Sequence, residues 1–385
     1  MKSARPTLKS IPKSTSQPTP QPTHGGNLRW AAELVGCLPQ DILDFSASIN
    51  PLGLPDSAIA AIHTTLPTLT AYPDPHYQRL RQAIATHHGI DCDWILPGNG
   101  AAELLSLACR ELAQHVTALF TPAFADYLRG LAAYDGVVGR LAIADFLTDG
   151  HSAVPKSRSL RQRLGNPSGS IALLLNNPHN PTGYLWARSQ IQAWIEEADL
   201  VIVDEAFMDF LPADRDQTVI EWVQQYPQLV VVRSLTKFYA IPGLRLGYAI
   251  AHPDRIKQWQ TWRDPWSVNS LATAVGEAVL NDRPYQQRTY EWLAIAKPQL
   301  ETGLQQLGLD FYPSVSNFLL VKTAQSVPDL QRQLLQRDRI LIRNCLSFPE
   351  LGDRFLRIAV RLVPENHRLL LSLASLINPE VSRKE

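Results

Sequence analysis

The sequence predicts an α/β fold with a large domain around a mostly parallel sheet, followed by a smaller α+β domain. Short aliphatic runs end abruptly in polar turn residues, and longer amphipathic stretches separate these runs. Strands of a parallel sheet are buried on both faces, so they lack the alternation of polar and apolar residues. After about Asn269 the pattern changes, which predicts the second domain.

Residues 1–23 precede the first of these elements. They are rich in Pro, Ser, Thr and Lys and include no acidic residue. Such a segment buries too little apolar surface to order itself, so we predict a disordered amino-terminal arm. It lacks the apolar stretch of a secretory signal, although its composition leaves an organelle transit peptide open.

Three aliphatic runs predict the centre of the sheet. They cover residues 171–175, 200–203 and 229–232, and each stops at polar residues. Residues 189–198, between the first two runs, have helical spacing. This part of the chain therefore predicts a strand–helix–strand unit, the usual connection between parallel strands.

The second domain begins with a long helical stretch from about residue 269 through Trp292 and beyond. Further along, the pattern predicts three strands and a closing helix, at residues 318–321, 340–342, 355–360 and 369–376. After the arm we divide the chain into three parts. Residues 24–50 form a segment that packs on the small domain and the active site. Residues 51–270 form the large domain, and residues 271–385 form the small domain.

Composition excludes several classes of protein. Thirty-six basic residues balance thirty-six acidic ones, which argues against a general nucleic-acid binder. No window approaches the 18 uninterrupted apolar residues that a membrane-spanning helix requires. The four cysteines form no CxxC pair and predict buried thiols in a reducing compartment. We therefore expect a cytoplasmic enzyme without a bound metal.

Lys237 is the first candidate for chemistry, because ligands of open parallel sheets bind beyond the carboxyl ends of the strands. It is one of only nine lysines and follows a predicted buried strand, after Ser234. A lysine there can form an imine with an aldehyde cofactor, and Arg245 could supply charge and hold a phosphate. For this motif alone, a surface lysine and a structural arginine remain the alternative.

Other residues fit the same cofactor. Asp204 could face a cationic ring nitrogen, or it could cap a helix. Residues 98–103 open a predicted helix whose N–H groups could bind phosphate, or they form a simple loop. Phe124 could stack on a planar ring or belong to the core. Together with Asn180 and Lys237, their order along the chain favours one shared cofactor site.

These residues resemble those of the fold-type I pyridoxal-phosphate enzymes of the aminotransferase superfamily. The shared motifs are NPTG at 180–183, DEAF at 204–207, SLTK at 234–237 and RLGY at 245–248. Longer stretches are similar to the threonine-phosphate decarboxylases of cobalamin biosynthesis, at residues 24–27, 44–53, 233–248 and 265–269. Histidinol-phosphate aminotransferases are near neighbours, and the resemblance spans residues 24–377.

The resemblance implies that the large domain has a seven-stranded sheet and binds pyridoxal 5'-phosphate. Lys237 would be the lysine that forms the covalent bond to this cofactor. Asp204 would pair with its ring nitrogen, Asn180 would touch its phenolic oxygen and Phe124 would stack on its ring. The implied phosphate contacts are Gly100, Ala101, Ser234, Arg245 and, from the second subunit of a homodimer, Tyr72. Phe207 departs from the superfamily, which often has a tyrosine there.

For the substrate, the resemblance implies that Arg357 grips a carboxylate while His24, Asn50 and Arg343 surround a phosphate. Taken alone, each arginine could instead form an ion pair at the edge of the core, and His24 could be an exposed loop histidine. The implied reaction is decarboxylation of O-phospho-L-threonine to (R)-1-amino-2-propanol O-phosphate.

Two alternatives stay open on the sequence. A histidinol-phosphate-type aminotransferase would use the same residues, because the rotation of one substrate bond decides whether the carboxylate or the hydrogen leaves Cα. A non-catalytic effector-binding module with this fold is the alternative from another class. Such modules usually accompany a basic DNA-binding domain, and the amino-terminal arm is too short for one.

Overall fold

The computed structural model describes residues 24–144, 159–165 and 169–377. The predicted arm at residues 1–23 lies outside the described residues, as does the end of the chain after residue 377. No helix in the described ranges is both long enough and apolar enough to span a membrane.

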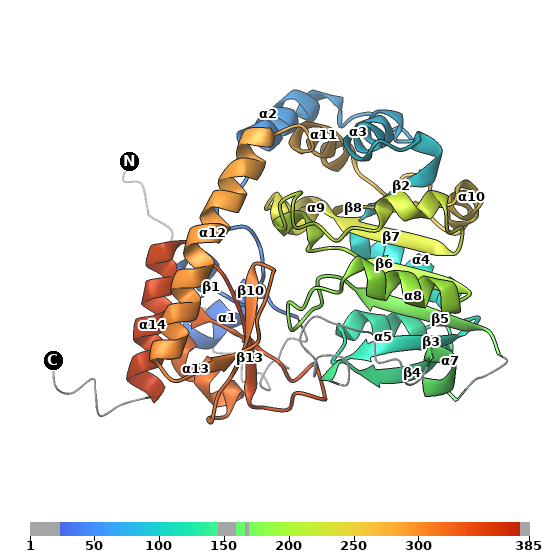
Figure 1. Cartoon of the computed structure of the whole chain (residues 1–385). Coiled ribbons are helices and arrows are strands. Elements are labelled where there is room, and N and C mark those ends of the chain that lie inside the picture. The colour runs from blue at the N-terminus through green and yellow to red at the C-terminus, as the bar shows by residue number, and fades with distance from the viewer. Residues whose placement is uncertain (1–23, 145–158, 166–168, 378–385) are drawn as a thin grey trace, which may run out of the picture.

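A seven-stranded sheet forms the centre of the large domain within the described ranges (Figure 1). Its strands, in spatial order, are β2 (Ile95–Asn99), β8 (Leu246–Ala251), β7 (Leu229–Ser234), β6 (Leu200–Asp204), β5 (Ile171–Asn176), β3 (Val116–Thr121) and β4 (Val137–Ala142). Neighbouring strands run parallel except at β8, which is antiparallel to both β2 and β7. The mostly parallel sheet confirms the predicted α/β fold class.

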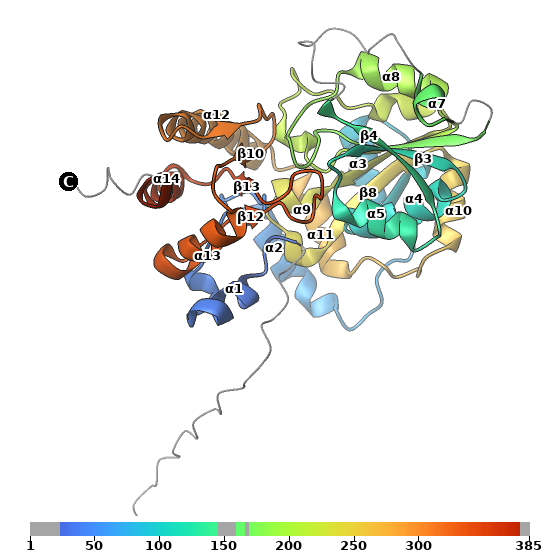
Figure 2. The ribbon, with the colours of Figure 1, turned by 90° about the horizontal axis from the view of Figure 1, so that it is seen from below.

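Helices cover both faces of this sheet, as Figure 2 shows for α8 and α5. One face carries α3 (Gln78–His88), α7 (Leu160–Arg163) and α8 (Arg188–Glu197), and the other carries α4 (Ala101–Leu112), α5 (Ala125–Ala132) and α10 (Pro253–Thr261). In β6, Val201 and Val203 belong to the first core, whereas Leu200 and Ile202 belong to the second. Each such buried side chain contributes about 1.5–3 kcal/mol, so both faces select aliphatic residues.

The small domain holds a separate four-stranded antiparallel sheet (Figure 1). Its strands, in spatial order, are β12 (Arg343–Asn344), β13 (Phe355–Ala359), β10 (Phe318–Lys322) and β9 (Asp310–Phe311), and its helices are α12 (Arg283–Gln306), α13 (Val327–Asp338) and α14 (Val363–Ile377). This sheet and its helices confirm the smaller α+β domain.

The helical stretch that the sequence predicts after residue 269 is two helices, not one. They are α11 (Ser270–Val279) and α12, which begins at Arg283. Asp282 marks the start of the second helix, because its side chain accepts a hydrogen bond from Tyr285 N–H at 3.0 Å and so caps α12. Pro284 follows in the first turn of α12, where no donor is lost.

The amino-terminal segment contains α1 (Leu28–Val35) and β1 (Leu43–Asp44). β1 pairs in parallel with β11 (Ile340–Leu341), so the predicted strand at 340–342 joins β1 rather than the four-stranded sheet. Phe45 C=O accepts from Ala359 N–H at 2.9 Å and joins the segment to β13 as well. The following helix, α2 (Asp56–Thr65), packs on α11.

All four cysteines are free thiols. Cys109 and Cys345 are buried as predicted, but the prediction is wrong for Cys37 and Cys92, which are only half-buried. Cys37 lies just after α1, and Cys92 begins a short 3-10 helix (Cys92–Trp94) just before β2, so the core does not enclose either side chain.

Candidate active site

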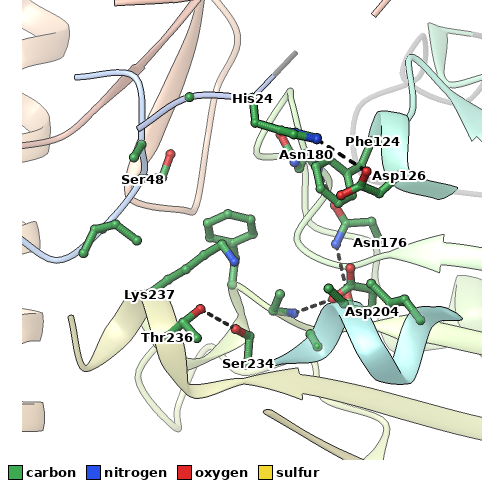
Figure 3. Close-up of a pocket in the computed structure, with 18 of the residues that line it drawn as sticks. His24, Ser48, Phe124, Asp126, Asn176, Asn180, Asp204, Ser234, Thr236 and Lys237 are labelled. Atoms are coloured by element: carbon green, nitrogen blue, oxygen red, sulfur yellow. Dashed lines mark hydrogen bonds and ion pairs between the residues drawn. The ribbon is translucent and has the colours of Figure 1, made fainter. Parts of the chain in front are cut away.

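A cavity of about 340 Å³ lies where the carboxyl ends of β5, β6 and β7 face the small domain (Figure 3). Most of the predicted site residues line it: His24, Ala101, Phe124, Asn180, Asp204, Ser234, Lys237, Arg245, Arg343 and Arg357. They come from the large domain, the small domain and the amino-terminal segment. The predicted residues that do not line it are Gly100, Tyr72 and Asn50.

Lys237 reaches the cavity because β7 ends at Ser234 and the short helix α9 (Leu235–Phe238) starts at once. Burial, together with the charges of Arg357 and Arg245, lowers the pKa of Lys237 to about 8, although the charge of Asp204 opposes the shift. The Nζ atom lies 5.1 Å from the centre of the Phe207 ring. A lysine with this pKa keeps part of its amine unprotonated near neutral pH and can act as a nucleophile.

Asp204 is a buried carboxylate, fixed through both of its oxygens. Tyr127 donates its hydroxyl hydrogen to Oδ2 at 2.5 Å, and Ala206 N–H donates to Oδ1 at 3.0 Å. Burial raises the pKa of Asp204, and the Tyr127 hydrogen bond and the charge of Lys237 counter that rise. Burial and the nearby carboxylate raise the pKa of Tyr127 well above its ordinary value, so the phenol remains a neutral donor.

Sequence reasoning did not find Tyr127. The available signal is its position one helical turn after Phe124, which places the two side chains on the same face at the start of α5. Their rings meet edge to face with centroids 5.5 Å apart. Tyr127 thus supports the candidate stacking residue as well as the candidate carboxylate.

A phosphate-sized cradle forms where α4 begins. Gly100 has φ +75°, and a Cβ there would lie 2.5 Å from Arg245 Nη2, so only glycine allows this approach. The first-turn N–H groups of the 12-residue helix, from Ala101 onward, have no partner within the helix. The Ser234 and Thr236 hydroxyls lie 2.7 Å apart beside them. Thr236 is a further lining residue that sequence reasoning missed, although it stands within the SLTK motif.

Asn180 and Arg357 join the two sides of the cavity. Arg357 Nη1 donates to Asn180 Oδ1 at 2.5 Å, and Arg357 Nη2 donates to Ser46 C=O at 3.4 Å. Among the described residues, the amide nitrogen of Asn180 has no hydrogen-bond partner, so it is available to a ligand. A single guanidinium therefore touches a loop of the large domain and the amino-terminal segment at once.

Arg343 and Arg357 are partners in the register of β12 and β13, so their side chains leave the sheet on the same face. Burial and, to a smaller extent, the like charge of Arg343 together lower the pKa of Arg357 to about 10. Two adjacent partly desolvated cations favour a bound anion. Within the described residues, Arg357 Nε and Ser48 Oγ are buried without a hydrogen-bond partner, which also points to a missing polar ligand.

Asn50 is held elsewhere. Its side-chain amide donates to Phe238 C=O and to Thr289 Oγ1, both at 2.8 Å, and so ties the backbone after Lys237 to α12. Tyr72 is 83% exposed and packs against Trp266, with ring centroids 4.9 Å apart. Tyr72 does not line the cavity of its own chain.

The groups present fit a phosphorylated aromatic aldehyde of the kind the sequence predicts. The phosphate of such a molecule fits the space beside Gly100 and Arg245 at the start of α4. Its aldehyde fits Lys237, and its ring nitrogen fits the fixed carboxylate of Asp204. Phe124 lines the same space. What remains of the cavity, beside the two arginines, fits a small anionic substrate.

Comparison with known proteins agrees with this arrangement. Residues 40–372 match the family model of class I and II aminotransferases. A threonine-phosphate decarboxylase from Salmonella typhimurium is 39% identical over 361 residues, which cover 92% of this chain and 96% of that protein. The adenosylcobalamin biosynthesis bifunctional protein CobDQ of Leptospira interrogans is 30% identical over 359 residues, 91% of this chain and 40% of that protein. A crystal structure of histidinol-phosphate aminotransferase from Clostridium acetobutylicum matches with a TM-score of 0.79 and 26% identity, covering 88% of this chain and 100% of that one.

Proposed function

The chain belongs to the class I and II aminotransferase family, and we propose that it is a pyridoxal-phosphate-dependent decarboxylase of O-phospho-L-threonine. The product is (R)-1-amino-2-propanol O-phosphate, for cobalamin biosynthesis. The observation that carries the proposal is the Arg343–Arg357 pair beside Lys237 and Asp204. A substrate with one amine, one carboxylate and one phosphate matches these groups, and the decarboxylase relative extends over nearly the whole chain.

The cofactor would lie between Phe124 and the strand ends. Ala101, Ser234, Thr236 and Arg245 would hold its phosphate, with Gly100 leaving the space. Bound pyridoxal phosphate supplies an electron sink for the charge that develops at the substrate Cα. Asp204, fixed by Tyr127 and Ala206, would keep a proton on the ring nitrogen, because a buried carboxylate favours a cation beside it.

Arg357 decides the reaction in this proposal. Arg357 would bind and orient the substrate carboxylate, and with the cofactor bound this orientation would favour loss of carbon dioxide over loss of the Cα hydrogen. Lys237 would then act as the general acid that returns a proton to Cα. Arg343 and His24 would hold the phosphate at the other end of the substrate. Because both ends of the substrate would then be held, rotation about its Cα bonds would be fixed. Asn50 would act on the substrate only after a local rearrangement, since its amide is bonded to Phe238 and Thr289.

Product analysis tests the proposal directly. Purified protein loaded with pyridoxal phosphate is incubated with O-phospho-L-threonine, with L-threonine as the unphosphorylated control. We expect carbon dioxide and aminopropanol phosphate from the first and at least about a hundredfold less from the second, because the second lacks the charged anchor. No release of carbon dioxide from O-phospho-L-threonine overturns the proposal.

A histidinol-phosphate-type aminotransferase is the second candidate, favoured by the match to the solved Clostridium acetobutylicum structure. It requires the same cofactor and the same lysine, but it transfers the amino group of its substrate and releases no carbon dioxide. Incubation with histidinol phosphate and 2-oxoglutarate distinguishes the two, since glutamate forms only in transamination. Binding of both substrates without any product would favour an effector-binding module.

We also propose a homodimer in which Tyr72 completes the cofactor phosphate site of the other subunit. The support is the high exposure of Tyr72 and of large apolar side chains near it in the chain, namely Leu54, Ile59, Leu66 and Leu69. The test is to unfold the two inactive variants Lys237→Ala and Tyr72→Ala, refold them together and measure the activity of the mixture. A mixed dimer regains one complete site, so activity should return. A cytoplasmic location remains a prediction from the free cysteines.

A further inference from the structure

The amino-terminal segment at His24–Gly26 docks tightly on the small-domain side of the cavity. A Cβ at Gly25 would lie 2.1 Å from Ser46 C=O, so the two backbones are in direct contact and only glycine fits. Gly26 N–H donates to Ser46 Oγ at 2.7 Å, and Ser46 Oγ donates to Asp44 Oδ1 at 2.6 Å. The place from which the His24 side chain starts is therefore well defined.

On the opposite side of the cavity, His24 meets Asp126 (Figure 3). The Nε2 atom lies 3.4 Å from Asp126 Oδ1, and the imidazole centroid lies 5.9 Å from that of Phe124. Asp126 belongs to the first turn of the eight-residue helix α5, where the helix dipole favours a negative charge. Arg129 Nε donates to the same carboxylate oxygen at 3.0 Å from outside the cavity.

The presence of Asp126 in an anion-binding cavity needs an explanation. Among the described residues that line the cavity, the carboxylates are those of Asp126 and Asp204. Asp204 has a partner in the proposed mechanism, whereas Asp126 has none. A free carboxylate here would repel a phosphate. Pairing with His24 and Arg129 offsets that repulsion and leaves the carboxylate as a fixed acceptor.

We propose that Asp126 is a positioning residue that orients His24 toward the phosphate of the substrate. With Nε2–H directed at Asp126, a protonated His24 ring has Nδ1–H left to donate to a phosphate oxygen. The contact also joins the amino-terminal segment to α5, and so sets the spacing between the phosphate end of the cavity and Phe124. This inference rests on the proposed function, because it assumes a phosphorylated substrate.

A double-mutant cycle tests the inference in the cofactor-loaded enzyme. Asp126→Asn keeps the size of the side chain and removes its charge, and we expect the KM for O-phospho-L-threonine to rise on the order of tenfold, with kcat changing much less. In a His24→Ala background the same substitution should change KM by less than about twofold, because the residue through which Asp126 acts is gone.

Inorganic phosphate provides a readout that needs no turnover. Its dissociation constant for the loaded enzyme, measured by calorimetry, should rise by a factor similar to that in KM. Asp126→Glu should recover most of the loss, and it keeps the test valid if Asp126→Asn is poorly folded. Asp329→Asn is the matched control, since Asp329 is another first-turn helix carboxylate that pairs with an arginine three residues later, Arg332, but it lies outside the cavity. We expect a change within about twofold for this variant.

Three results overturn the inference: a lower KM in Asp126→Asn, an equal rise in both backgrounds, or unchanged phosphate affinity. A lower KM would mean that Asp126 only repels the substrate, and an equal rise that it acts without His24. The failure of the proposed function is a separate outcome. In that case the wild-type enzyme releases no carbon dioxide, yet the phosphate affinity still depends on Asp126.

Discussion

The cofactor end and the substrate end of the cavity are built in different ways. The cofactor end consists of side chains at the carboxyl ends of three neighbouring strands, with the beginnings of α4, α5 and α9 beside them. The substrate end consists of His24, Arg343 and Arg357, which come from an amino-terminal turn and two short strands of the small domain.

The difference in construction assigns binding of the cofactor to one end of the cavity and selection of the substrate to the other. One continuous sheet holds Lys237 and Asp204, so their spacing depends on strand pairing that both hydrophobic cores support. The substrate residues depend on how two domains and one segment meet. Arg357 is the exception, because its hydrogen bond to Asn180 connects the two ends. We therefore expect substitutions at the cofactor end to abolish chemistry and those at the substrate end to change substrate affinity.

The largest effect is expected at the cofactor end. Lys237→Ala should lower kcat by at least about a thousandfold and remove the absorbance of the lysine-bound cofactor, because the described residues that line the cavity include no second lysine. Lys297→Ala is the matched control, since Lys297 is another lysine whose pKa burial lowers, but it lies outside this cavity. It should keep both turnover and absorbance. Retained turnover in Lys237→Ala would contradict the enzymatic assignment.

A smaller effect of another kind is expected at the substrate end. Arg343→Gln should raise the KM for O-phospho-L-threonine on the order of a hundredfold, because a charged contact to phosphate is lost. The dissociation constant of pyridoxal phosphate should change by less than about twofold. Equilibrium dialysis with the cofactor and steady-state kinetics provide the two values. A comparable loss of cofactor affinity would show that the two ends are not separate.

The protonation of Lys237 predicts a pH dependence of cofactor capture. Only the unprotonated amine attacks the aldehyde, so capture by the cofactor-free protein should accelerate as the pH rises and level off above about 8, the pKa of this amine. At pH 7 we expect a rate about tenfold below the plateau. Stopped-flow absorbance measures it. Asp204→Asn should shift the midpoint downward, because the Asp204 charge raises this pKa. A midpoint near 10.5, the ordinary lysine value, would contradict the burial argument.

The smallest effect is expected for Tyr127→Phe, which changes a supporting residue at the cofactor end of the cavity. It removes one hydrogen bond to Asp204 and leaves the ring in place, so we expect kcat to fall by about fivefold and cofactor affinity to weaken by a similar factor. Tyr134→Phe, on an exposed side chain just after the same helix, is the control and should match the wild type. An unchanged cofactor spectrum and affinity in Tyr127→Phe would mean that Ala206 N–H alone is enough to fix Asp204.

Local pattern predicted the sheet and the strand-end residues well. The aliphatic runs at 171–175, 200–203 and 229–232 begin where β5, β6 and β7 begin, and they end one or two residues before these strands end. Asp204 and Ser234 end two of these strands, and Lys237 follows within one helical turn. A buried parallel strand has to be aliphatic, and it has to become polar where it meets a ligand, so both signals are local.

Contacts between distant segments could not be predicted in this way. The Tyr127–Asp204 hydrogen bond joins residues 77 positions apart, and no spacing rule connects them. Asn50 was expected at the substrate phosphate, but the structure commits its amide to Phe238 and Thr289. The break before α12 was missed because helical periodicity continues across it, and only the Asp282 cap marks the new start.

By itself, the amino-acid sequence determined the fold class, the strand ends and the residue types that a cofactor aldehyde and its phosphate require. These follow from burial and periodicity, which act over a few neighbouring residues. Only the tertiary structure decided that Arg343 faces Arg357 across a strand pair, and that His24 meets Asp126 from another part of the chain. The register of two strands and the meeting of two domains depend on the packing of the whole molecule, and no short stretch of sequence contains that information.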